Sequence, residues 1–305
     1  MSKLAIPTLR SAFGERLQEN ISLAAYTSAR IGGMADALIV VHSVDELVET
    51  LSQLWEMDMP YLLLGGGSNI LVGDAGFRGV VVLNKAKGIR FSESENPFVW
   101  AESGVTMSRL ANQAATRGFA GLEWAATVPG TVGGAVYGNA GAFGGDMAGS
   151  LRSAELLTRH GQEEWPVEAM DYAYRSSALK RDAVERVILS AELKLKNGDP
   201  AKIHERMRQY IHQRKETQPP GASMGSMFKN PEGDYAGRLI EAAGLKGTRI
   251  GNAEISNVHA NFFINHGETK ASDVRRLIEL TQKTVFEKFS IQLALEIEFV
   301  GEYHE

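Results

Sequence analysis

The chain has 305 residues, enough for two domains or one large one at about 150 residues each, and its balance of 44% hydrophobic and 23% charged residues argues against extensive disorder. A net charge of -5, without any block of basic residues, argues against a nucleic-acid partner. Because the chain has no cysteine and no apolar run near the roughly 18 residues that span a membrane, we expect a cytoplasmic protein without disulfides, thiolate metal sites or membrane helices.

The first half of the chain alternates between predicted strands and helices. Short apolar runs bounded by turn residues predict buried strands at 37–41, 61–64 and 80–83. Ser43 followed by Glu46 is a capping-box sequence, and apolar residues at helical spacing after it predict a helix over 44–57. A second helical pattern begins at Met107 and ends near Gly118. This alternation indicates an α/β fold.

The second half changes in character along its length. Strands are predicted at 154–157 and 187–195, and the second alternates like a half-exposed strand. A helix over about 200–216 stops before Pro219 and Pro220, which cannot propagate a helix and mark a candidate domain boundary. Further patterns predict helices at 236–243 and 274–289 and a closing strand over 293–300. This part of the chain is predicted to be α+β.

The first of three glycine clusters, Gly65 to Gly67, directly follows a predicted strand and precedes Ser68 and Asn69. Bare main chain of this kind can cradle a phosphate, and it also serves an ordinary tight connection between strands. The dinucleotide-binding spacing fails because Ile70 stands where a glycine is needed. This cluster alone therefore leaves both interpretations open.

The second cluster is denser. Eight of the 21 residues from 129 to 149 are glycine, where the average over the chain predicts about two. Such a segment buries few side chains, so it is either a simple loop or a surface that brings main chain close to a ligand with phosphate and planar ring parts. With Gly32 and Gly33, three glycine segments are candidates to converge on one long ligand.

Five motifs occur together in an order that resembles the UDP-N-acetylenolpyruvoylglucosamine reductases. The resemblance runs from about residue 26 to the C-terminus, and the chain length is similar to the branch of the family that lacks one substrate-covering loop. Gly138 and Phe143 depart from the family, where methionine and tyrosine are common. The motifs are Arg-Ile-Gly-Gly-Met-Ala-Asp at 30–36, Gly-Gly-Gly-Ser-Asn at 65–69, Pro-Gly-Thr-Val-Gly-Gly-Ala at 129–135 with Asn-Ala-Gly at 139–141, Tyr-Arg-Ser-Ser at 174–177, and Gly-Ser-Met-Phe-Lys-Asn-Pro at 225–231.

The resemblance implies both a fold and a reaction. It implies an FAD-binding α/β domain of the vanillyl-alcohol-oxidase type over 1–197, with two subdomains, and a smaller α+β substrate domain over 198–305. NADPH would reduce non-covalently bound FAD, which would then reduce UDP-N-acetylglucosamine enolpyruvate to UDP-N-acetylmuramate for peptidoglycan. The implied FAD-binding residues are Arg30, Ile31, Gly32, Gly65, Gly66, Gly67, Ser68, Asn69, Pro129, Gly130, Thr131, Gly133, Gly134 and Asn139.

The same resemblance assigns catalytic side chains. Reduction of the enolpyruvyl group places negative charge on the substrate carboxylate, so the reaction needs cationic or hydrogen-bonding stabilisation there and a proton donor at the neighbouring carbon. The resemblance implies Ser226 as proton donor and Arg175 and Glu296 as stabilising groups, although strand alternation puts Glu298 on the same face as Glu296. The implied substrate-binding residues are Tyr174, Lys229 and Asn230.

Other interpretations of the sequence remain. A sugar or alcohol oxidase on the same scaffold usually attaches its flavin through histidine or cysteine, but the chain has no cysteine and no histidine in its glycine clusters. A non-catalytic nucleotide-binding module would make the assigned side chains structural. His204 and His212 are too far apart on their predicted helix to share a metal ion, so no metal is expected, and the oligomeric state leaves no mark on the sequence.

Overall fold

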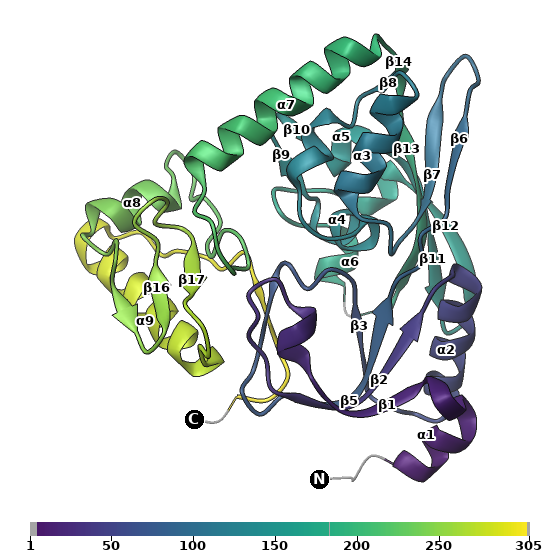
Figure 1. Ribbon diagram of the computed structural model, residues 1–305, viewed down its shortest axis with the longest axis horizontal. Coiled ribbons are helices and arrows are strands. Elements are labelled where there is room, and N and C mark those ends of the chain that lie inside the picture. The colour runs from purple at the N-terminus through teal and green to yellow at the C-terminus, as the bar shows by residue number, and fades with distance from the viewer. Residues whose placement is uncertain (1–4, 183, 304–305) are drawn as a thin grey trace. The chain divides into compact units, whose positions relative to one another are not determined.

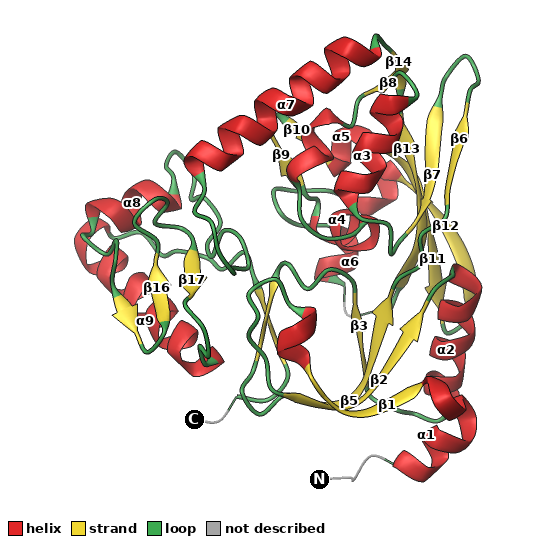
Figure 2. Ribbon diagram, in the orientation of Figure 1, coloured by secondary structure: helices red, strands yellow, loops and turns green. Residues whose placement is uncertain are grey.

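A computed structural model of the chain describes residues 5–182 and 184–303 (Figure 1). Figure 2 shows where helices, strands and loops alternate along it. The helices are α1 (Ile6–Phe13), α2 (Val44–Glu56), α3 (Met107–Thr116), α4 (Val132–Gly138), α5 (Met147–Ser150), α6 (Ala178–Arg181), α7 (Pro200–Thr217), α8 (Ala236–Ala242) and α9 (Ala271–Phe289). Within the described residues, none of them is both long and apolar enough to cross a bilayer.

The strands form several separate sheets. One has the order β1-β2-β5-β3, and a five-stranded sheet has the order β12-β11-β13-β7-β6. The strands are β1 (Leu17–Ser22), β2 (Met34–Val41), β3 (Tyr61–Leu64), β4 (Ile70–Val72), β5 (Phe77–Asn84), β6 (Ile89–Ser92), β7 (Phe98–Glu102), β8 (Phe119–Ala120), β9 (Gly141–Ala142), β10 (Gly145–Asp146), β11 (Leu151–Thr158), β12 (Gly161–Pro166), β13 (Val187–Lys194), β14 (Lys196–Asn197), β15 (Arg249–Ile250), β16 (Ala253–Ile255), β17 (Phe263–Asn265) and β18 (Glu298–Val300).

Helix α2 confirms the expected capping signal at its start. The Ser43 hydroxyl accepts a hydrogen bond from the Glu46 N–H at 3.1 Å, and Glu46 Oε2 accepts one from the His42 N–H at 2.8 Å. Two main-chain donors at the helix start, where no intrahelical partner exists, are thereby satisfied. The predicted strands on either side of this helix are confirmed as β2 and β3.

The central strand of the five-stranded sheet differs from its prediction. A half-exposed strand over 187–195 is wrong, because Val187 to Ala191 are all buried in β13. Strand β13 pairs with β11 on one side and β7 on the other, and it also contacts helices α2 and α4. Exposure is confined to its end, at Glu192 and Lys194. A strand covered on both faces has buried residues along most of its length, even where apolar and polar residues alternate in its sequence.

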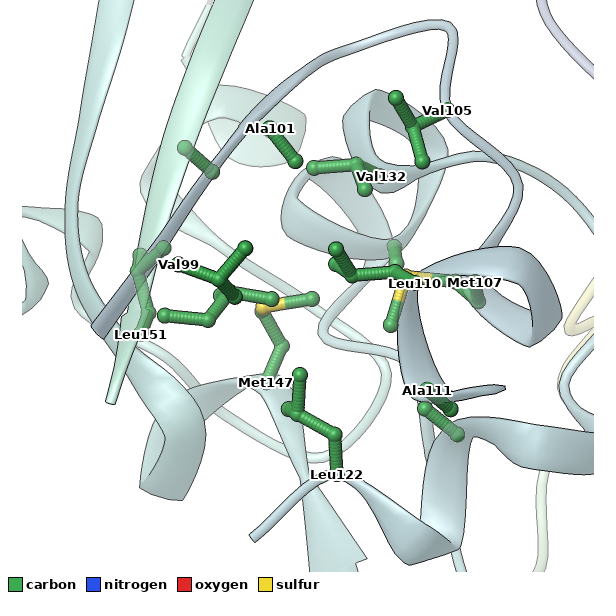
Figure 3. Packing of buried hydrophobic residues seen from close by; sticks show 14 of the residues in the cluster. Val99, Ala101, Val105, Met107, Leu110, Ala111, Leu122, Val132, Met147 and Leu151 are labelled. Carbon is green, nitrogen blue, oxygen red and sulfur yellow. The ribbon is translucent and has the colours of Figure 1, made fainter. Parts of the chain in front are cut away.

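A large apolar cluster joins this sheet to the helices beside it. Helices α3, α4 and α5 lie along one face of the sheet (Figure 1), and Figure 3 shows Val99, Leu110, Val132 and Met147 pointing toward one another from four different elements. All four side chains are fully buried. This packing fixes the start of α4, which directly follows the predicted cofactor loop at 129–131.

The chain divides into two compact units. Unit 1 is built from Met1–Leu38, Gly67–Val81 and Lys215–Glu305, and unit 2 from Ile39–Gly66 and Val82–Arg214. Helix α7 ends before Pro219 and Pro220, as expected. The expected domain limits of 1–197 and 198–305 stay a prediction.

Unit 1 contains the C-terminal elements. Strands β15, β16 and β17 form an antiparallel sheet against which α9 packs, and α8 packs on α9. Asp74 caps α9 from far along the chain: its Oδ1 accepts from the Ala271 N–H at 2.7 Å and its Oδ2 from the Ser272 N–H at 3.0 Å. A carboxylate at a helix N-terminus satisfies unpaired donors and complements the helix dipole.

The closing strand is shorter than predicted. Only Glu298–Val300 forms strand β18, which pairs in parallel with β4, and the chain bends at Glu296 and Ile297. Leu293 and Ile297 are buried as the alternation suggests, but Phe299 is 44% exposed. The alternation therefore ends at the bend, because β18 has a single neighbouring strand.

Candidate active site

Two of the predicted cofactor segments lie against each other in unit 2. A Cβ built on Gly65 would come within 2.5 Å of Thr131 Oγ1, and one built on Gly66 would come within 2.8 Å of Gly130 Cα. Both distances are shorter than side chains tolerate, so the two main chains approach as closely as glycine allows. The first and second glycine clusters, far apart in the sequence, are therefore brought together.

The start of α4 is anchored to the neighbouring loop by main-chain hydrogen bonds. The Val132 N–H donates to the Val105 carbonyl at 2.8 Å, and the Gly133 N–H donates to the Ser103 carbonyl at 2.9 Å. A Cβ on Gly133 would lie only 2.9 Å from Ser103 Cβ. Packing within unit 2 therefore already explains why position 133 has no side chain.

At two other glycines of α4, packing within the protein does not explain why a side chain is absent. A Cβ on Gly134 would meet only Thr131 Oγ1, at 3.8 Å, and one on Gly138 would have no described atom within 4 Å. Glycine within a helix costs about 1 kcal/mol relative to alanine. Bare main chain that faces open space fits a ligand that packs directly on the helix. These residues thus fit FAD, whose phosphates and planar ring need such an approach.

The tight turn that carries Tyr174 and Arg175 docks on the end of α4. Ala173 and Ser176 exchange main-chain hydrogen bonds of 3.1 Å, which places Tyr174 and Arg175 at the tip, where Arg175 has a φ of +53°. The Asn139 amide donates to the Ala173 carbonyl at 2.9 Å. The turn is thereby held at the C-terminal end of the helix.

The Arg175 guanidinium points back to the same loop. Its Nη2 donates to the Gly141 carbonyl at 3.0 Å, and its Nη1 donates more weakly to the Asn139 carbonyl at 3.4 Å. The guanidinium carbon lies 5.5 Å from the ring centre of Tyr174, a side chain that is 54% exposed. Within unit 2, the structure thus brings together Asn139, Tyr174 and Arg175.

Tyr172 reinforces this arrangement through a hydrogen bond to α4. Its hydroxyl donates to the Val136 carbonyl at 2.9 Å, and burial, with the nearby Asp146 carboxylate, raises the pKa of Tyr172 well above its ordinary value. The hydroxyl therefore remains a donor at any physiological pH. The Ser177 hydroxyl adds a hydrogen bond of 2.6 Å to the Tyr137 carbonyl. Neither residue was among the predicted site residues.

In unit 1 the segment that contains Ser226 lies between two other stretches of chain. On one side the Met227 N–H donates to the Asn261 carbonyl at 2.8 Å, and Ser226 forms an antiparallel bridge with Phe262. On the other side the Glu296 N–H donates to the Met227 carbonyl at 3.0 Å. The chain around Ser226 is therefore fixed next to the chain around Glu296, and both side chains are half-buried.

Asn69 links a predicted cofactor motif to the same place. Its side-chain amide donates to the Glu296 carbonyl at 3.1 Å, and its own carbonyl accepts from the Glu298 N–H at 3.0 Å. The amide of Asn69 thus orients the main chain of Glu296. Its predicted contact with FAD stays a prediction, as does that of the half-buried Ser68 beside it.

Lys229 and Asn230 follow Ser226 on the same segment. The Lys229 N–H donates to the Ala294 carbonyl at 2.8 Å, and its side chain is half-buried. The Asn230 side-chain oxygen accepts from the Ala236 N–H at 3.1 Å, at the first residue of α8. Asn230 therefore has a structural task that the sequence did not suggest.

The loop at 27–32 is ordered by hydrogen bonds from other parts of unit 1. The Ser28 N–H donates to the Gly67 carbonyl at 3.0 Å, and the Asn265 amide donates to the Ala29 carbonyl at 2.8 Å. Arg30 is exposed with a φ of +55°, Ile31 is buried, and a Cβ on Gly32 would lie 3.1 Å from Val72 Cβ. This loop and Gly67 are thus neighbours within unit 1.

Sequence reasoning missed Asn261 and Asn265, the two asparagines that organise these segments. Asn261 lies within the apolar run 260–264, and Asn265 directly follows it. A buried polar side chain in such a run needs hydrogen-bond partners, and this is the one signal that could have identified them. Among the described residues there is no cluster of three or more His, Asp or Glu residues suited to a metal ion.

Comparisons with known proteins agree with this arrangement. A family model described as an FAD binding domain matches residues 35–165, and one described as the C-terminal domain of UDP-N-acetylenolpyruvoylglucosamine reductase matches residues 213–300. A UDP-N-acetylenolpyruvoylglucosamine reductase of Chloroflexus aggregans is 43% identical over 290 residues, which cover 93% of this chain and 97% of the relative. That of Bacillus subtilis is 42% identical over 284 residues, covering 92% and 93%.

A solved structure extends the likeness to the fold. The crystal structure of a UDP-N-acetylenolpyruvylglucosamine reductase from Thermus caldophilus superimposes with a TM-score of 0.78 at 34% identity, over 93% of this chain and 99% of that one. The expected order of an FAD-binding domain of the vanillyl-alcohol-oxidase type followed by a separate C-terminal domain of the family is confirmed.

Proposed function

Because the chain belongs to the family of UDP-N-acetylenolpyruvoylglucosamine reductases, we propose that Ser226, Arg175 and Glu296 perform its reaction. The family enzyme is an FAD-dependent UDP-N-acetylmuramate dehydrogenase of peptidoglycan synthesis that uses NADPH. The roles of individual residues are the proposal. They rest on the local geometry of each residue, taken one at a time.

The glycine segments are the proposed FAD site. When bound, FAD supplies transfer of a hydride from NADPH to the enolpyruvyl double bond. The bare main chain of Gly134 supports this assignment, because nothing in the protein's own packing requires glycine there. The residues proposed to hold FAD are Arg30, Ile31, Gly32, Gly65, Gly66, Gly67, Ser68, Asn69, Pro129, Gly130, Thr131, Gly133, Gly134 and Asn139.

Arg175 is proposed to stabilise negative charge on the substrate carboxylate. A planar guanidinium can bind a carboxylate through two parallel hydrogen bonds, which an ammonium group cannot do. The hydrogen bond from its Nη2 to the Gly141 carbonyl holds the plane of the guanidinium in advance. A charge held in place before the reaction stabilises the enolate-like intermediate without any reorganisation.

Ser226 is proposed to protonate the enolate-like carbon. An ordinary hydroxyl is a weak acid, so it can act only toward a strong base and at a site shielded from water. The half-buried position of Ser226 and the hydrogen bonds on both sides of Met227 support this role. The carbon gains a proton, and the hydroxyl is restored by proton exchange with solvent.

Glu296 rather than Glu298 is the carboxylate proposed to help stabilise the enolate-like intermediate. The single observation that carries the proposal is the hydrogen bond from the Glu296 N–H to the Met227 carbonyl, which puts Glu296 beside the chain segment of Ser226. Glu298 instead begins β18, where it pairs with Ile70. Tyr174, Lys229 and Asn230 are the proposed substrate-binding residues, with Lys229 providing a positive charge for the diphosphate.

Ser226→Ala tests the proton-donor role. We expect NADPH to bleach the flavin at the rate of the parent enzyme, whereas turnover of UDP-N-acetylglucosamine enolpyruvate is lost, because only the second half-reaction needs the proton. Stopped-flow flavin absorbance measures the two half-reactions separately. Ser272→Ala, at the half-buried second position of α9, is a matched control that should change neither rate. An equal loss in both half-reactions would contradict the assignment.

Arg175→Lys tests the carboxylate contact. We expect kcat to fall about 10²-fold, as when one donor to a developing negative charge is removed, because lysine keeps the charge and loses the two-pronged contact. Steady-state NADPH oxidation measures the effect. A kcat equal to that of the parent would remove Arg175 from the mechanism.

A further inference from the structure

We propose that Asn261 is a positioning residue that sets the place of Ser226 and Lys229 for the second half-reaction. This inference rests on the proposed function, because it concerns the segment that carries the proposed proton donor. Asn261 itself lies on a different stretch of chain and is only 3% exposed. It acts on Ser226 through the main chain of the residues between them.

The side-chain amide of Asn261 makes hydrogen bonds to both main-chain polar groups of one residue, Phe228. Its Oδ1 accepts from the Phe228 N–H at 2.9 Å, and its Nδ2 donates to the Phe228 carbonyl at 2.8 Å. Its own carbonyl accepts from the Met227 N–H at 2.8 Å. Asn261 thus holds two consecutive residues, Met227 and Phe228, by three hydrogen bonds.

The side chain of Asn261 replaces main-chain hydrogen bonds that a paired β-strand would make. Ser226 bridges Phe262 through the main chain, but at Phe228 the amide side chain of Asn261 takes the place that a neighbouring strand would occupy. The main chain of Phe228 would otherwise have a buried donor and acceptor without partners on this side. The ring of Phe228 is fully buried and packs edge-on against Phe263, with ring centres 6.2 Å apart.

The opposite edge of the segment is held separately. The Met227 carbonyl accepts from the Glu296 N–H, and the Lys229 N–H donates to the Ala294 carbonyl. Asn261 therefore fixes the distance between the segment and the chain that carries Glu296 by holding the segment from the other side. Without it, we expect Ser226 and Lys229 to shift together.

Asn261→Ala and Asn261→Asp measure this effect in the holoenzyme. For Asn261→Ala we expect the NADPH-dependent bleaching of the flavin to stay within about twofold of the parent and re-oxidation by the enolpyruvyl substrate to slow about 10²-fold, the loss typical of a displacement near 1 Å. Loss of the fold alone would slow both half-reactions, so this split distinguishes positioning from stability.

The aspartate variant adds a pH signature. An ionised carboxylate at 261 accepts from the Phe228 N–H but repels the Phe228 carbonyl, whereas the protonated acid donates to that carbonyl again. We expect the re-oxidation rate of Asn261→Asp, relative to the parent, to recover as the pH falls. The rate ratio for Asn261→Ala should stay flat over the same range. A flat ratio for the aspartate variant would overturn the inference.

Hydrogen exchange gives a readout that does not depend on activity. In Asn261→Ala, the amide of Phe228 loses its acceptor, so we expect faster exchange in a peptide covering 225–231. Asn257→Ala is the matched control, because its side-chain amide donates a hydrogen bond of 3.0 Å to Glu254, away from the Ser226 segment. It should change neither this exchange rate nor either half-reaction.

The outcomes separate the two proposals. If Ser226→Ala blocks re-oxidation and Asn261→Ala leaves both re-oxidation and Phe228 exchange unchanged, the positioning role is refuted and the proton donor stands. If Ser226→Ala has no effect on re-oxidation, the proposed function fails first. Slower re-oxidation together with faster Phe228 exchange in Asn261→Ala, and normal bleaching, supports the inference.

Discussion

The bare surface of α4 allows a prediction in which protein stability and cofactor affinity change in opposite directions. In Gly134→Ala the new Cβ would meet only Thr131 Oγ1, at 3.8 Å, which is ordinary van der Waals contact. Alanine within a helix is more favourable than glycine by about 0.5–1 kcal/mol, so the apoprotein should become more stable by about that amount.

The same methyl group should weaken FAD binding. If the cofactor packs directly on the helix, a methyl group forced into that contact costs about 1–3 kcal/mol, as in an overpacked core. Since 1.4 kcal/mol corresponds to a factor of ten in Kd, the affinity for FAD should fall by about 5- to 150-fold. The helix would thus gain stability and lose its cofactor.

Two measurements test this prediction. Urea unfolding of the apoprotein gives the stability, and titration with FAD followed by flavin fluorescence gives the Kd. Gly133→Ala is the matched control, because its Cβ would lie 2.9 Å from Ser103 Cβ and should destabilise the apoprotein itself. A more stable Gly134→Ala apoprotein with unchanged FAD affinity would refute the assignment of α4 to the cofactor.

Two further predictions concern the fold of unit 1. Asp74→Ala should lower the free energy of unfolding by about 1–2 kcal/mol, because the N–H groups of Ala271 and Ser272 lose their acceptor; Asp74→Asn, which keeps one oxygen, should lose less, and equal losses in urea unfolding would contradict the cap. The Arg238 guanidinium and the Tyr235 N–H lower the pKa of Asp234 to about 2, from an ordinary value of about 4. Because the folded-state pKa is the lower one, the stabilisation is present above pH about 4 and is lost as the pH falls toward about 2, so Asp234→Asn should flatten this acid limb of stability.

Much of the fold follows from local patterns. Helix α2 begins where Ser43 and Glu46 predict, because its capping hydrogen bonds are made within four residues of chain. Strand β13 was predicted to within one residue at its end but with the wrong exposure. Its burial depends on β11, β7 and two helices, none of which is visible in its own alternation.

The functional site is harder to predict from the sequence than the fold. The glycine clusters were visible as composition, and the contact of Gly66 with Gly130 confirms that two of them meet. Asn261 was visible only as a polar residue in an apolar run, and its partner could not be predicted, because Phe228 lies 33 residues away and the pairing is created by the tertiary fold. The assignments of Ser226 and Arg175 came from motif resemblance, and no pattern of spacing alone would have singled them out.

Because synthesis runs from the N-terminus to the C-terminus, the two units are completed at different times. Unit 2 has all of its residues once Arg214 has emerged, whereas Asn69 waits for Glu296, which is synthesised 227 residues later. Until Glu298–Val300 arrives, the edge of β4 has no strand to pair with in its sheet. An unpaired edge of this kind can pair with another chain, so we expect β4 to be a site of association between nascent chains until their C-terminal third has been synthesised.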